Sequence, residues 1–136
     1  MWQDIRQKIL DVIQANSSLL QAVYRTDRSK FDGYPAAIIA PSEHESDYED
    51  TKTDELTFVF TVTVFQSIAD VGEDQADIIL EKVVDELISL FLDRRVLGNT
   101  VEWVLPVNSR WGYQDRPDGQ VRVAELKLRC RKYIGN

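Results

Sequence analysis

Carboxylates are concentrated in one short segment of this chain, and carboxylates often serve as general acids, general bases or ligands of hard cations. The segment contains Glu43, His44, Glu45, Asp47, Glu49, Asp50, Lys52, Asp54 and Glu55. Its seven acids and one base give a net charge of −6, out of −7 for the whole chain. The other 16 acidic and 15 basic residues nearly balance. We infer that this local acidity repels other molecules or meets positive charge.

The types and spacing of these residues do not favour catalysis or metal binding. His44 is the only histidine, and a loop gives it none of the rigid support that general-base catalysis requires. Asp47, Glu49 and Asp50 match a calcium loop only loosely, because no glycine stands at the sharp turn. Glycoside hydrolysis needs two carboxylates at a fixed separation, which a flexible loop does not supply. We predict no enzymatic activity, metal site or cofactor, and interpret the segment as a solvated hairpin tip.

A basic strand near the end of the chain is the counterpart of the acidic segment. It contains Arg122, Lys127, Arg129, Arg131 and Lys132 against a single acid, Glu125. The acidic balance of the whole chain argues against general affinity for nucleic acid. We favour ion pairing with the acids of a neighbouring strand or a neighbouring subunit. Complementary patches that cannot meet within one chain promote head-to-tail contacts, which close into rings.

Cysteine and the aromatic residues give weaker signals. Cys130 is the only cysteine, alternates with leucines on an apolar strand face and is predicted to be an inert core thiol. Trp103 falls on the apolar face of its predicted strand, so we expect it in the core and not in a binding pocket. Trp111-Gly112-Tyr113 is expected in a loop, where exposure would mark a partner surface.

Hydrophobic periodicity predicts six elements. They are a helix over residues 2–15, strands over 34–40 and 56–66, a helix over 72–97 and strands over 101–107 and 120–133. Residues 19–24 fit a short helix or an edge strand equally well. The sequence from Arg116 to Gly119 is typical of a tight turn before the last strand.

The strand over residues 56–66 alternates most regularly. One set of its side chains is apolar and is predicted to face the core: Leu56, Phe58, Phe60, Val62 and Val64. The other set is rich in threonine: Thr57, Val59, Thr61, Thr63 and Phe65. Together with the bases of the last strand, the second set is too polar for a core. We expect that face of the sheet to meet water or another subunit.

The length and composition indicate one domain that spans residues 1–136. The chain has 136 residues, of which 43% are hydrophobic, and this is enough for a single core. Neither a secretory signal nor a membrane span is apparent, so we expect a soluble, intracellular protein. The order helix, strand, strand, helix, strand, strand predicts an α+β fold. Its sheet would be mainly antiparallel or mixed, with two helices packed on one face.

Over nearly its whole length the chain resembles small neck proteins of tailed phages, and among them the tail terminators. The resemblance is carried by the segment from Phe31 to Glu43, which includes the sequence GYPAA, and by the acidic spacer that follows. The order of the long strand, the helix from Gly72 and the closing basic strand adds to it.

The resemblance implies a structural virion protein without enzymatic activity, assembled in the host cytoplasm. Such subunits form a hexameric ring on the end of the tail tube, stop its growth and provide the surface on which the head connector docks. The implied partners are further copies of the chain, the tail tube protein and the connector, with no membrane, and with DNA only passing through the channel. The acidic hairpin over residues 42–55 would project to one end of the ring. The alternatives are another neck or head-completion protein, or an unrelated acidic module of the toxin-neutralising type.

Overall fold

The computed structural model describes residues 2–47, 53–94, 97 and 101–135, without the side chains of residues 43–55 and 133–135. The elements in chain order are α1 (Trp2–Asn16), β1 (Ala22–Tyr24), β2 (Ala36–Asp47), β3 (Thr53–Ser67), α2 (Ile68–Val71), α3 (Glu73–Asp93), β4 (Trp103–Arg116) and β5 (Gly119–Gly135). The predicted α+β class with a mixed sheet is confirmed. The predicted order matches only roughly, because β1 and α2 are additional elements.

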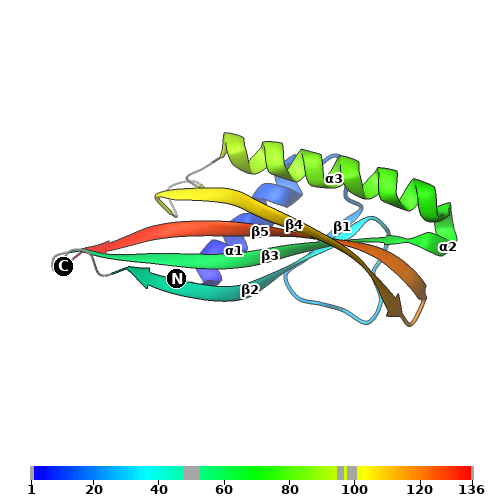
Figure 1. Cartoon of the computed structure of the whole chain (residues 1–136), viewed down its shortest axis with the longest axis horizontal. Coiled ribbons are helices and arrows are strands. Elements are labelled where there is room, and N and C mark those ends of the chain that lie inside the picture. Colours follow the sequence, from blue (N-terminus) through cyan, green and yellow to red (C-terminus); the bar gives the residue numbers. More distant parts are fainter. Residues whose placement is uncertain (1, 48–52, 95–96, 98–100, 136) are drawn as a thin grey trace.

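The described strands form a single sheet in the order β1-β2-β3-β5-β4 (Figure 1). β1 is parallel to β2, and all other neighbouring pairs are antiparallel. The undecided segment 19–24 therefore contributes an edge strand. The short helix α2 escaped prediction because four residues show no helical period. It is capped at its start, where the Ser67 hydroxyl accepts a hydrogen bond from the backbone N–H of Asp70.

The main core lies between one face of the sheet and the helices α1 and α3 (Figure 1). The predicted inward set of β3 is confirmed, since Phe58, Phe60, Val62 and Val64 are at most 2% exposed. Cys130 of β5 is fully buried in the same core, as predicted. Burial raises the pKa of its thiol to about 12, so the reactive thiolate is rare at neutral pH.

The opposite face of β3 is less open to solvent than predicted. Thr57 and Thr61 are buried, although α1 and α3 both pack on the other face. In the strand register they lie opposite Arg131 and Lys127 of β5. The aliphatic parts of such long side chains cover short neighbours on a central strand. This face therefore combines buried hydroxyl groups with half-buried bases.

The predicted core position of Trp103 is wrong. Val104 is the fully buried residue and pairs with Cys130 of β5. Trp103 is half-buried on the opposite face, where the guanidinium carbon of Arg131 lies 4.7 Å from the ring centroid. Large apolar residues occupy consecutive positions here, so alternation alone could not assign the faces.

β4 is also longer than predicted, because it continues past Val107 to Arg116. Trp111-Gly112-Tyr113 consequently lies inside this strand and not in a loop. The predicted tight turn follows it, with Arg116 paired to the first residue of β5 across Pro117 and Asp118.

Two β-bulges interrupt the sheet, one in each outer long strand. The register shifts after Pro41 in β2 and after Pro106 in β4. Pro41 pairs with Phe60 of β3, Phe60 pairs with Leu128 of β5, and Leu128 pairs with Pro106. Both bulges therefore begin at the same row across the sheet.

One carboxylate joins the end of α1 to α3. The Ser17 hydroxyl donates to Glu86 Oε1 at 2.5 Å, and the Ser18 hydroxyl and backbone N–H donate to Oε2 at 2.8 and 3.1 Å. Burial alone would raise the pKa of Glu86, but hydrogen bonds from Ser17, Ser18 and the Leu19 backbone outweigh it and lower the pKa.

α3 itself ends at Asp93, before the predicted end, and the predicted glycine stop at residue 98 lies outside the described residues.

Replacing Glu86 with Gln should make stability less dependent on pH. In the unfolded chain the pKa of Glu86 is about 4.3, and in the folded protein it is lower. The charged carboxylate therefore stabilises the fold fully at pH values above the unfolded pKa. This stabilisation is lost as the pH falls through the folded pKa. We expect Glu86→Gln to be less stable than the parent by on the order of 1 kcal/mol at pH 7. The difference should shrink at pH 3. Urea unfolding at both pH values measures it, and an equal difference at both would contradict the assignment.

Candidate interaction surface

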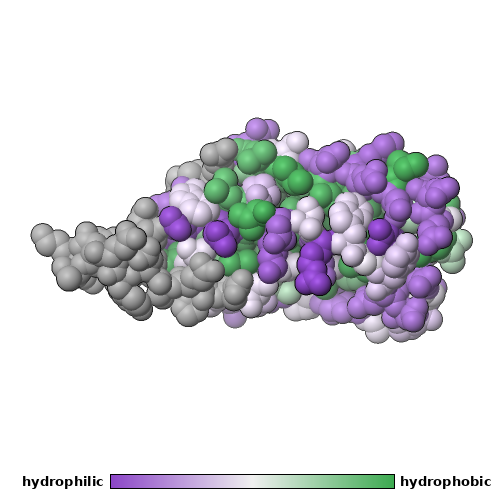
Figure 2. Space-filling model, viewed as in Figure 1, coloured by the Kyte–Doolittle hydropathy of each residue, from purple (hydrophilic) through white to green (hydrophobic). Residues whose placement is uncertain are grey.

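The face of the sheet opposite α1 and α3 carries the basic residues of β5. Lys127, Arg129 and Arg131 occupy alternate positions there and are half-buried. Figure 2 looks onto this face and shows hydrophilic residues in a broken line along it, with apolar residues between them. We call this side of the sheet the uncovered face and the three bases the basic row.

The bases of this row differ in what they contact. Arg131 stacks on Trp103, as described above. Within the described part of the chain, Lys127 and Arg129 make no ion pair. The Nε atom of Arg129 is buried and has no hydrogen-bond partner there. A buried donor without a partner is costly, so an acceptor brought by another molecule would improve this site.

Arg122, the fourth predicted interaction residue of β5, lies on the other side of the sheet. Its Nε donates to Asp77 Oδ1 of α3 at 2.5 Å, and its Nη1 donates to the Gly112 carbonyl at 2.7 Å. Its guanidinium carbon also lies 4.4 Å from the ring centroid of Tyr113. The structure therefore separates Arg122 from the basic row and uses it to hold α3 against β4.

The backbone register brings the predicted acidic segment to the same end of the sheet as the basic row. Glu43 pairs with Val59 of β3, which pairs with Arg129, and Glu45 reaches Arg131 in the same way through Thr57. Two strand spacings, about 10 Å, separate the backbones. In Figure 1 these strands extend past both helices.

The remaining acidic positions are only partly described. Asp47 pairs with Glu55, and Asp54 pairs with Ile134 of β5. Glu49 and Asp50 lie outside the described residues, as do the side chains of the other five predicted acids and of His44. Among the described residues, no three His, Cys, Asp or Glu side chains gather where a metal ion could bind.

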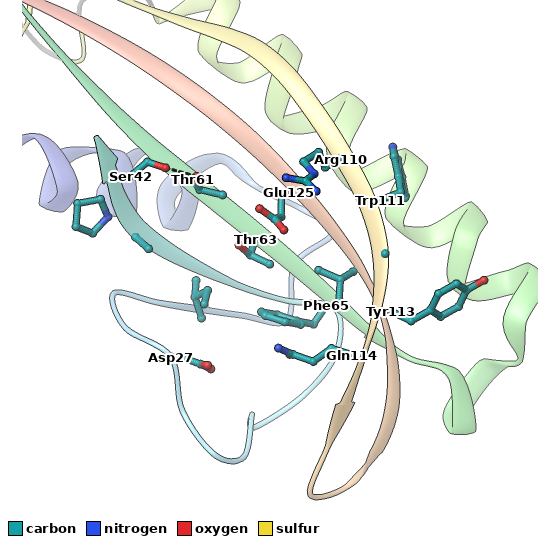
Figure 3. A pocket seen from close by; sticks show the side chains of 15 residues that line it. Asp27, Ser42, Thr61, Thr63, Phe65, Arg110, Trp111, Tyr113, Gln114 and Glu125 are labelled. Carbon is teal, nitrogen blue, oxygen red and sulfur yellow. Dashed lines mark hydrogen bonds between the residues drawn. The ribbon is translucent and has the colours of Figure 1, made fainter. Parts of the chain in front are cut away.

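A trough of about 470 Å³ runs across the uncovered face between β2 and β4 (Figure 3). Short polar side chains of β2 and β3 line it, and the hydroxyls of Ser42 and Thr61 lie 3.1 Å apart in a hydrogen bond. Arg110 of β4 and Glu125 of β5 line its other side. They are directly paired in the register but form no ion pair. The trough therefore offers charged groups and hydroxyls to a polar occupant.

Arg116 lies next to the trough and donates hydrogen bonds to Asp27 and Gln114, two residues that line it. Its side chain is only 6% exposed and lies over the rings of Phe31 and Phe65, with centroid distances of 4.3 and 5.0 Å. Its Nη2 donates to Asp27 Oδ1 at 3.1 Å and to the Arg28 carbonyl. These contacts hold the loop after β1 against the β4–β5 hairpin. A small second core, which includes Phe31, Phe65, Val121 and Val123, lies beneath it.

The outer edge of β4 is open to solvent. Within the described chain β4 pairs only with β5, and residues 107–115 are exposed except for Gly112. Trp111 and Tyr113 are 41% and 51% exposed. Beyond the bulge after Pro106, this edge is therefore a candidate site for the addition of a strand from another chain.

The outer edge of β2 is protected over its first half. β1 pairs with residues 36–38, and the next carbonyl, that of Ile39, accepts a hydrogen bond from Arg6 Nε at 2.9 Å. Pro41 then has no N–H to offer. The two edges of the sheet are therefore not equivalent.

Sequence reasoning found the basic row but missed Arg110, Arg116 and the open edge. The alternation of Arg110, Gly112 and Gln114 with Trp111 and Tyr113 is a strand signal that was obscured by the glycine. Apart from Gln114, the partners of Arg116 are far away in sequence, so no local pattern could have revealed them.

Comparison with known proteins adds no identification. No protein-family model matches the chain, and no curated protein matches it. No helix in the described part of the chain combines the length and apolar character that a membrane crossing requires.

Proposed function

We propose that this chain is a non-enzymatic structural subunit that assembles into a ring, and that the ring is the tail terminator of a tailed phage. The observation that carries the proposal is the uncovered face, where Lys127 and Arg129 make no ion pair within the described part of the chain and lie beside the edge strand β4. A second copy of the subunit would supply partners for both features.

In the proposed ring, α1 and α3 face outward, and neighbouring subunits meet through the sheet. The basic row contacts carboxylates of the neighbour. The alternative is that it faces DNA in the channel, but a channel through which DNA slides should not hold phosphates tightly. Asp54 and Glu55 of β3 belong to the end of the sheet that extends past the helices (Figure 1), and in this ring they would contact a tube or connector protein.

The ring is tested by measuring mass and by imaging. We expect light scattering at micromolar concentration to give a multiple of the subunit mass, either alone or after addition of tail tube protein, and negative-stain images to show rings on tube ends. Capped tubes that no longer elongate would support the terminator function. A strict monomer that does not bind tubes would overturn it. Activity in filling tailless heads would point instead to a head-completion protein.

A further inference from the structure

We propose that the open edge of β4 receives, as an added strand, the acidic end of β2 (residues 42–47) from a second copy of this chain. The inference rests on the proposed ring and specifies its subunit contact. In this arrangement the sheet of one subunit continues into the next. Each copy gives one strand segment and accepts another, so the contact is head-to-tail and can close into a ring.

The first argument comes from the two sheet edges. β1, the Arg6 side chain and Pro41 protect β2 as far as residue 41. From Glu43 to Asp47, by contrast, the backbone of β2 pairs only with β3, and no other strand among the described residues lies on its outer side. The other free edge is that of β4, at the opposite side of the sheet. Two complementary edges on opposite sides are what a repeating sheet needs.

The second argument is charge. Glu43, Glu45 and Asp47 occupy alternate positions, so in a strand they share one face. On the uncovered face of β4, Arg110 is exposed and makes no hydrogen bond or ion pair within the described chain, and Lys127 follows in the same direction on β5. A strand added with its acids on this face would place a carboxylate beside Arg110, with Lys127 one strand further in, about 10 Å from the added backbone. The acidic segment then compensates the basic surface of the neighbour.

The third argument is apolar area. Trp111 and Tyr113 stand on the helix side of β4, where Arg122 already lies over both rings. Their outer parts are exposed because no further strand covers them. An added strand would bury this area and would satisfy the free backbone groups of the edge.

Disulfide trapping tests the contact without removing any of the charges that we invoke. We would prepare His44→Cys in one copy and Ser109→Cys or Asp115→Cys in another, two exposed β4 positions that cover more than one register. Disulfides form only when Cα atoms approach to roughly 4.4–6.8 Å. The native Cys130 is fully buried and should not compete. Ser89→Cys, an exposed position on α3, is the matched control.

We expect mild oxidation of the mixture to give about tenfold more cross-linked dimer with a β4 cysteine than with the α3 control, because assembly raises the effective concentration. A synthetic peptide of residues 42–56 should compete, and a scrambled peptide should not. Rings without any β4 cross-link would overturn the inference and leave the proposed function intact. Cross-linking and peptide binding by a chain that never forms rings would support the inference and contradict the ring.

Discussion

Replacing Lys127, Arg129 and Arg131 together with glutamate is expected to abolish assembly while leaving the subunit folded. The three side chains lie in one row on the uncovered face. Their reversal changes the net charge by six units at a surface that we propose to meet carboxylates. Like charges that face each other across a contact cost several kcal/mol of binding free energy. This cost exceeds the free energy with which most weak assemblies associate. Light scattering of the variant, with and without tube protein, measures the effect.

The matched control reverses three exposed bases elsewhere, Lys30, Lys82 and Arg94. It changes the net charge by the same amount but leaves the basic row intact, so it should still assemble. Circular dichroism and thermal melting must show that the test variant is folded. If a folded triple variant assembles like the parent, the basic row faces the channel or solvent, and our assignment of the subunit contact is wrong.

Replacing Arg116 with alanine is expected to cause a large loss of stability, about 2 kcal/mol. The guanidinium belongs to an almost fully buried side chain, lies over two aromatic rings and donates to Asp27, Gln114 and the Arg28 carbonyl. Its removal leaves a gap over the second core and releases the loop after β1. Urea unfolding at pH 7 measures the change.

Two variants separate the causes of this loss. Arg116→Lys keeps the charge but not the planar fork, so most of the loss should remain. Arg28→Ala removes a base of the same loop whose side chain is 49% exposed and pairs with Asp32 at 3.7 Å. Such surface pairs contribute little, and we expect a change below about 0.5 kcal/mol. Equal losses in Arg116→Ala and Arg28→Ala would contradict the structural role of Arg116.

The sequence was sufficient for elements with a long, clear period. The inward face of β3, the two long helices and the turn before β5 follow from local alternation and from glycine and proline positions. The side of the sheet on which Trp103 lies could not be predicted from local alternation, because its environment is set by Arg131 on another strand. The length of β4 was missed for a similar reason, since residues 108–116 are mostly polar and become a strand only by pairing with β5.

The candidate surface was predictable only in part. The sequence places bases at alternate positions of β5, which predicts that Lys127, Arg129 and Arg131 share one face of the strand. Their separation from Arg122 also follows from strand parity. The openness of the β4 edge could not be predicted, because it depends on strand order in the sheet, and that order is set by the pairing of β3 with β5, two strands distant in sequence. Protection of β2 by Arg6 likewise depends on how α1 docks.

The paired bulges add a local bend and extra twist to the sheet at one level. They begin at Pro41 and Pro106, on one row across the sheet, so both outer strands lose regular hydrogen bonding there. Only the pairing of β3 with β5, at Phe60 and Leu128, carries the ladder across the row unbroken. The acidic end is therefore expected to turn out of the plane of the rest of the sheet at this level. In the proposed ring, this bend would set the angle at which the acidic end meets its partner.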